Sequence, residues 1–148
     1  MPEERPALET ACVLSVEDNP GDIRLIKEGV DAVGDNIELR QYTNGQQTID
    51  AFVEDDLHPE GIDLVFLDLN LPGKSGLEIL QRIRKEQAYD RVPVVVLSSS
   101  ENPDDIQRVY EESGNAYLTK PVDPDKFIQT IVAAIQFWIS TANTDSQK

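Results

Sequence analysis

Residues 64–76, LVFLDLNLPGKSG, contain the transition that decides the fold. Four apolar residues lead directly into Asp68, and such a continuous apolar run is typical of a strand buried on both faces of a parallel sheet. The sequence SGLE that follows carries the capping box of a helix start, formed by Ser75 and Glu78. We therefore expect a strand, a loop that carries Asp68, and a helix. A carboxylate at the end of a buried strand is costly unless something compensates its charge.

Strand-like and helix-like segments alternate along the rest of the chain. Strands are expected at 12–16, 37–42, 62–67, 92–97 and 116–119, and helices at 20–33, 45–55, 76–88, 103–113 and 124–141. Five strand–helix units in succession predict an α/β fold with a parallel sheet. Three sequences, NPGD, NPDD and DPDK, support the helix starts, because each places Asn or Asp before a proline that opens a helix.

The character of each strand predicts the order of the sheet. The runs LVFL and VVVL are continuously apolar, which indicates central positions, whereas IELRQY alternates and AYLTK is short, which suits edges. We expect a doubly wound, flavodoxin-like (βα)5 fold. Its five parallel strands would lie in the order 2-1-3-4-5, with helices on both faces of the sheet.

The chain of 148 residues fits a single domain over 1–148, with a core at about 11–141 and short polar tails. There is no run of about 18 apolar residues and no signal-peptide pattern, so we expect a cytoplasmic protein without a membrane partner. The single cysteine, Cys12, excludes an internal disulfide and a cysteine metal site.

The formal net charge of −15 opposes binding to nucleic acid, which needs a positive surface. The 28 acidic residues are spread along the chain and outnumber 13 basic ones. They fit either an ordinary solvated acidic surface or a halophilic-like adaptation to high salt, because salt screens the repulsion between carboxylates.

Candidate site residues follow four of the five predicted strands, at the end where such sheets bind ligands, while the second strand contributes only Thr43 and Asn44. The candidates are Glu17 and Asp18 after the first strand, Asp68 after the third, Ser98 after the fourth and Lys120 after the fifth. Three carboxylates in one small site need cations, and Lys120 supplies a single positive charge. An all-oxygen set suits Mg²⁺ or Mn²⁺, the usual ions for handling a phosphoryl group. Each residue alone is ordinary loop chemistry, but their common place predicts a joint site.

The same residues resemble the receiver domain of two-component response regulators, the family of the single-domain chemotaxis regulator. The resemblance covers about residues 11–140. It rests on the acid pair in VEDN, the Asp in DLNLPGKSG, the Ser in VVVLSSS, Tyr117 in NAYLTKP, and the pair Lys120–Pro121. It implies a stand-alone phosphoprotein of a two-component system, which acts in signal transduction and is not an enzyme with a separate substrate.

The resemblance also implies a role for each acidic residue. Asp68 would be the nucleophile that takes a phosphoryl group from a phosphohistidine of a sensor histidine kinase. Mg²⁺ would be bound directly by Asp18, Asp68 and the backbone carbonyl of Asn70. Glu17 would act on the ion through water.

The other residues would neutralise charge and transmit the signal. Lys120 and Mg²⁺ would neutralise the negative charge on the transferring phosphoryl oxygens. Ser98 would form a hydrogen bond with the aspartyl phosphate. Tyr117 would then change rotamer. That change would alter the surface formed by 103–113, 116–119 and 124–141, to which a downstream protein would respond.

Other classes of protein remain as alternatives. A Mg²⁺-dependent phosphohydrolase with an aspartyl phosphate would carry its nucleophile after the first strand, with a second Asp two residues on, which DLN in the third strand does not match. A module that binds partners independently of phosphorylation would lack the acid pair, Asp68 or Lys120. A flavodoxin-like electron carrier needs a phosphate-cradling loop where the acidic EDNPGD stands, and a transcription factor needs an output domain, for which we expect no room after residue 141.

The final helix, DKFIQTIVAAIQFWIS, is expected to make a protein–protein contact. At about 100° per residue, one stripe of apolar side chains is wide enough to cover the sheet. A second apolar group widens the apolar arc of the helix to about 160°, whereas a helix packed on one sheet face needs an arc of roughly 100°. The first stripe is Phe127, Ile131, Ala134 and Trp138, and the second group is Ile128, Val132 and Ile139, with Ile135 between the two. The expected interface is made by Ile128, Val132, Ile135 and Ile139. Either the helix at 20–33 shields the second group or a partner covers it, and the receiver resemblance favours a homodimer. The FW pair and the long helix also resemble stand-alone receivers that partner bacteriophytochromes, which implies a phytochrome-like kinase.

Overall fold

The computed structural model describes residues 10–34, 36–53 and 59–146. Its centre is a parallel sheet of five strands in the order β2-β1-β3-β4-β5, which confirms the predicted order. The strands are β1 (Ala11–Val16), β2 (Ile37–Tyr42), β3 (Leu64–Leu67), β4 (Val94–Ser98) and β5 (Ala116–Thr119).

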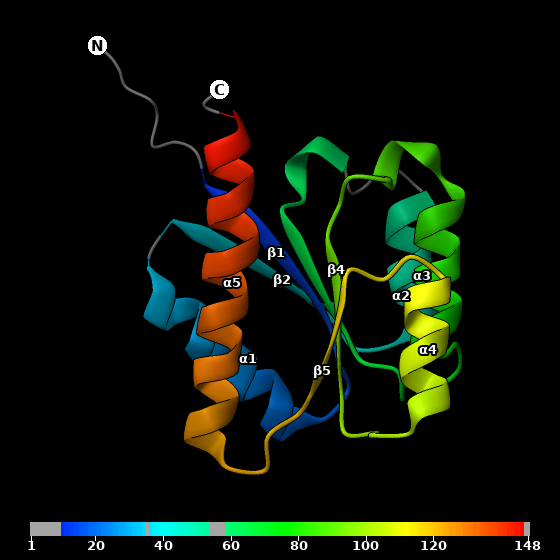
Figure 1. Ribbon diagram of the computed structural model, residues 1–148, viewed down its shortest axis with the longest axis horizontal. Coiled ribbons are helices and arrows are strands. Elements are labelled where there is room, and N and C mark those ends of the chain that lie inside the picture. The colour runs from blue at the N-terminus through cyan, green and yellow to red at the C-terminus, as the bar shows by residue number, and fades with distance from the viewer. Residues whose placement is uncertain (1–9, 35, 54–58, 147–148) are drawn as a thin grey trace.

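Helices cover both faces of this sheet. They are α1 (Pro20–Val33), α2 (Gly45–Val53), α3 (Gly76–Lys85), α4 (Pro103–Glu111) and α5 (Pro124–Ser146). α1 and α5 pack together on one face, and α2, α3 and α4 lie on the other (Figure 1). Among the helices of the described ranges, none is long and apolar enough to cross a membrane.

The predicted helix starts are present as hydrogen bonds. The side chains of Asn19, Asn102 and Asp123 accept bonds from backbone N–H groups in the first turns of α1, α4 and α5. Ser75 and Glu78 form the expected reciprocal capping box at α3. These caps satisfy N–H groups that a helix start leaves without partners, so local sequence fixes where these helices begin.

Several element ends differ from the prediction by a few residues. β3 begins at Leu64 rather than at 62, because the chain first makes a 3₁₀ turn at Pro59–Gly61. β4 begins at Val94 rather than at 92, because the backbone N–H of Val92 closes a turn on the carbonyl of Tyr89. α3 and α4 end earlier than expected, at Lys85 and Glu111, while α5 continues to Ser146. His58, the single histidine of the sequence, lies outside the described residues.

Apolar side chains fill both sides of the sheet. One cluster lies beneath α2, α3 and α4, and the other beneath α1 and α5. β3 and β4 are buried along their whole length, whereas β2 alternates between half-buried and exposed positions, as predicted for an edge strand. In the described part of the chain, the buried acidic side chains are those of Glu17 and Asp68.

The wide apolar arc of α5 is shared between the sheet and α1. A Cβ at Gly29 of α1 would come within 2.6 Å of the Ile131 side chain, so the two helices are in close contact there. Ile135 is 1% exposed and belongs to the core; it is therefore not part of the exposed edge that the sequence predicted. The other three residues of that edge are half-buried: Ile128, Val132 and Ile139.

Two aromatic side chains stand near the middle of α5. Trp138 is partly buried against the core beneath α1 and α5. Phe137 is 60% exposed and meets Trp138 edge-on, with ring centroids 5.0 Å apart. Phe137 therefore extends the apolar surface of α5 on a side that the sequence analysis did not include.

Candidate functional site

The carboxyl ends of the strands meet at one edge of the sheet, and the structure brings Asp68 to the middle of that edge. The backbone N–H of Asp68 donates to the carbonyl of Val16 at 3.1 Å, which continues the pairing of β3 with β1. Gly76 lies so close to the Asp68 carbonyl that any Cβ there would collide with it. Asp68 is 5% exposed. The sharp return of the chain into α3 thus holds this carboxylate in a fixed position.

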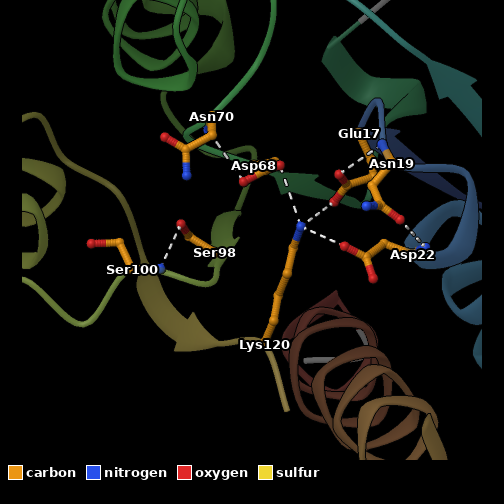
Figure 2. A network of polar contacts seen from close by, with 8 residues as sticks. All are labelled: Glu17, Asn19, Asp22, Asp68, Asn70, Ser98, Ser100 and Lys120. Carbon is orange, nitrogen blue, oxygen red and sulfur yellow. Dashed lines mark hydrogen bonds and ion pairs between the residues drawn. The ribbon is translucent and has the colours of Figure 1, made fainter. Parts of the chain in front are cut away.

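The ammonium of Lys120 is the centre of the site (Figure 2). Its Nζ lies 2.8 Å from Oε1 of Glu17, 2.8 Å from Oδ2 of Asp22 and 3.3 Å from Oδ2 of Asp68. The backbone N–H of Lys120 donates to the carbonyl of Ser98 at 2.8 Å, so the end of β5 is fixed to β4. One cation therefore faces three carboxylates in a largely buried place.

The buried groups shift one another's protonation. Burial raises the pKa of Glu17 to about 7; the hydrogen bond from Lys120 opposes this rise, and the charge of Asp68 adds to it. Burial alone would lower the pKa of Lys120, but its hydrogen bonds to Asp22 and Glu17 and the negative charges around it raise that pKa above its usual value. Lys120 thus stays charged, and one ammonium does not balance the carboxylates around it.

Glu17, Asp18 and Asp68 can hold a divalent cation. Each offers a carboxylate oxygen, and these oxygens lie within 4.8 Å of one another. Asp18 is exposed while the other two are buried, so the group opens to solvent on one side. The backbone N–H of Asn70 donates to Oδ1 of Asp68 at 3.2 Å, which brings the Asn70 peptide beside the group. This oxygen-only chemistry suits Mg²⁺ or Mn²⁺ and leaves room for water and phosphoryl oxygens.

The loop between β4 and α4 connects Ser98 to Tyr117 through Ser100. The Oγ of Ser98 is buried and accepts a hydrogen bond from the backbone N–H of Ser100 at 3.2 Å. The carbonyl of Ser100 accepts a hydrogen bond from the Tyr117 hydroxyl at 2.7 Å. The Oγ of Ser100 donates to Asp105 of α4 at 2.7 Å. Tyr117 therefore lies apart from the Lys120 cluster but is joined to the rim by two consecutive hydrogen bonds.

Two residues of this site, Asp22 and Ser100, were not among the predicted ones. Asp22 stands in NPGD, which indicated only a helix start, and its contact with Lys120 depends on how α1 lies against β5. Ser100 was part of the SSS run that follows the fourth strand. The available signals were the extra acid close to the pair in EDNPGD and the third hydroxyl of the run, and neither distinguishes a site residue from an ordinary loop residue.

A family model for the response regulator receiver domain matches residues 13–132. The chain therefore belongs to the response regulator receiver domain family, in agreement with its strand order and with the acids, hydroxyl and lysine at its rim.

Individual relatives are similar over most of their length. Response regulator Rcp1 of Synechocystis sp. is 35% identical over 132 residues, which span 87% of this chain and 89% of Rcp1. The crystal structure of the phosphorylated cyanobacterial phytochrome response regulator RcpA matches with a TM-score of 0.80 at 36% identity, over 88% of this chain and 95% of RcpA. The Mn²⁺-bound form of Rcp1 matches with a TM-score of 0.78 at 34% identity, over 88% of this chain and 96% of Rcp1.

Proposed function

We propose that this receiver accepts a phosphoryl group on Asp68 from a phosphohistidine of a sensor histidine kinase. The observation that carries the proposal is the placement of Asp68. Its carboxylate is fixed at the rim, lies 3.3 Å from the Lys120 ammonium, and shares a group of three close carboxylates with Glu17 and Asp18. A rigid nucleophile between an ammonium and a cation-binding group is suited to phosphoryl transfer, in which positioning and charge stabilisation dominate.

In the transfer, a carboxylate oxygen of Asp68 forms a bond to phosphorus while the bond from phosphorus to the histidine nitrogen breaks. The electron pair of the broken bond stays on the imidazole, and the product is an aspartyl phosphate. Lys120 stabilises negative charge on the transferring oxygens. Asp18, Asp68 and the Asn70 carbonyl would hold Mg²⁺, with Glu17 acting through water, and the ion would supply further positive charge. The protein thereby promotes its own phosphorylation and slow dephosphorylation, and turns over no separate substrate.

The path through Ser100 supplies the switch. When Ser98 turns its hydroxyl to the new phosphoryl oxygens, it gives up the bond from the Ser100 backbone. The Tyr117 hydroxyl, held by the Ser100 carbonyl, then changes position. This moves the surface of α4, β5 and α5, to which a downstream protein binds.

The relatives favour a particular kind of kinase. RcpA is described as a phytochrome response regulator, and RPA3017, with a TM-score of 0.76 at 27% identity, as a response regulator in red light signalling of R. palustris. We infer a phytochrome-like sensor histidine kinase as the partner, a cytoplasmic location, and a homodimer formed through α5. The net charge of −15 argues against a nucleic-acid partner.

Labelling with acetyl phosphate tests the phosphoacceptor. With Mg²⁺ present, the wild type should take up one acid-stable, base-labile phosphate, and Asp68→Asn should take up none. Asp90→Asn is the matched control, because Asp90 is exposed and lies in the turn before β4, away from the rim. Equal labelling of Asp68→Asn and the wild type would refute the assignment.

The same experiment separates the alternatives. With acetyl phosphate in excess, a phosphohydrolase would release inorganic phosphate over many rapid turnovers. Once the donor is removed, the phosphorylated receiver should release about one equivalent, at the rate at which its own phosphate is lost. A phosphorylation-independent module would take up no label at all.

A further inference from the structure

The ammonium of Lys120 faces as many carboxylates as it has N–H bonds. A protonated lysine carries three N–H bonds, and the three carboxylates of Glu17, Asp22 and Asp68 lie within ion-pair distance of its Nζ. For Lys120 to bind a phosphoryl oxygen, as proposed above, one of these carboxylates has to give up its contact.

Asp22 is the carboxylate that gives up Lys120 at the lowest cost. Its side chain is 23% exposed, against 2% for Glu17 and 6% for Asp68, so water can solvate it after the contact breaks. Glu17 and Asp68 are also held by other groups. Oε2 of Glu17 accepts from the backbone N–H of Asn19 at 3.2 Å, and Asp68 accepts from Asn70 at 3.2 Å.

The backbone fixes where Asp22 lies. Its N–H donates to the side chain of Asn19 at 3.0 Å, in the first turn of α1. Figure 2 shows the result: the Lys120 Nζ lies between Asp68 on one side and Asp22 on the other. Asp22 is thus placed to draw the ammonium away from the carboxylate that would receive the phosphoryl group.

We propose that Asp22 is a positioning residue that restrains Lys120 in the unphosphorylated protein and releases it to the phosphoryl group. This inference rests on the proposed function. Removing the Asp22 carboxylate frees one N–H of Lys120 and also takes a negative charge away from the incoming phosphoryl oxygens. Both effects act in the same direction, so phosphorylation of Asp68 should become faster, by about two- to fivefold for a partly exposed ion pair.

The test is the initial rate of phosphorylation by acetyl phosphate at saturating Mg²⁺. Asp22→Asn and Asp22→Ser should both exceed the wild type, and Asp22→Glu, which keeps a carboxylate, should return the rate towards it. Asp31→Asn is the matched control. It removes one negative charge from the same helix, but its carboxylate pairs with Lys27 at 3.3 Å on the exposed face. Melting temperatures of all variants check that each one is folded.

The outcomes separate the inference from the proposed function. If Asp22→Asn and Asp22→Ser phosphorylate no faster than Asp31→Asn, the positioning role is wrong while Asp68 remains the phosphoacceptor. If Asp22→Glu is as fast as Asp22→Asn, the carboxylate is not what restrains Lys120, and the inference also fails. A wild type that takes up no phosphate on Asp68 would overturn the proposed function and this inference together.

Discussion

Glu17 is a buried carboxylate whose pKa reaches about 7 in the metal-free protein. The ordinary pKa of a Glu is 4.5, so between pH 4.5 and about 7 the folded protein holds a proton that the unfolded chain has lost. Glu17 therefore favours the metal-free fold at low pH, and this contribution is lost as the pH rises through about 7. A cation bound nearby favours the ionised form instead.

We predict that Mg²⁺ affinity increases several-fold between about pH 6 and pH 8, because Glu17 has to lose its proton before it can support the ion. Titration calorimetry at several pH values measures this. In Glu17→Gln the affinity should be weaker and should change little with pH. An equally steep dependence in Glu17→Gln would assign the proton to another group.

Gly76 determines the position of Asp68 by having no side chain. A Cβ at 76 would collide with the Asp68 carbonyl and press on the Cα of Leu69. We predict that Gly76→Ala lowers the free energy of unfolding by about 1–3 kcal/mol, the usual cost of overpacking, and also weakens Mg²⁺ binding because the Asp68 peptide must move.

Urea denaturation and calorimetry measure the two effects of Gly76→Ala. Gly61→Ala is the control, since a Cβ at 61 meets nothing within 4 Å. If Gly76→Ala were as stable as Gly61→Ala and bound Mg²⁺ with unchanged affinity, the loop would not be what fixes Asp68.

Among the elements, α5 is the one for which we expect a contact with a second copy of the chain. Its arc is partly covered by α1, and Ile135 is in the core. Among the α5 side chains that the structure describes, Phe137 is the large apolar one that is exposed. We predict that the wild type sediments as a dimer at high concentration and that Ile128→Glu/Val132→Glu abolishes the dimer. Phe137→Glu tests the opposite side of the helix. A wild type that stays monomeric with and without a phosphoryl mimic would leave only kinase or target docking for this surface.

Strand order and helix starts were predictable because their causes are local. The apolar runs of β3 and β4, the alternation of β2, and caps such as Asn19 act within a few residues of each other. The convergence of Glu17, Asp18, Asp68 and Lys120 was predictable as well, because parallel strands bring their carboxyl ends to one edge.

What could not be predicted depends on how elements lie against each other. Helical periodicity placed Ile135 between the sheet and the outer edge, but the close contact of α1 at Gly29 decides how much of the arc is buried. Asp22 meets Lys120 although 98 residues separate them in the chain. No local pattern encodes the distance between the first turn of α1 and the end of β5.

At the scale of the whole molecule, the net charge of −15 is the dominant feature. At 0.01 M salt the Debye length is about 30 Å, so carboxylates repel across the domain, whereas at 1 M it is about 3 Å. We predict that the melting temperature rises between low and molar KCl. Replacing three exposed acids, Glu28, Glu60 and Glu101, with Gln should raise the melting temperature at low salt and make it depend less on the KCl concentration. A melting temperature that does not change with KCl would contradict adaptation to high salt and would favour an ordinary solvated acidic surface.

The position of Trp138 determines which events tryptophan fluorescence can report. It is the single tryptophan of the chain, and α5 leaves the rim at Pro124, so Trp138 lies 14 residues along the helix, at about 1.5 Å per residue roughly 20 Å from that end. Its emission therefore reports the packing of α1 against α5 and the unfolding of the domain. An optical readout of cation or phosphoryl binding needs a second fluorophore, and a tryptophan in the exposed loop between β5 and α5, as in Val122→Trp, would place one two residues after Lys120 in the chain.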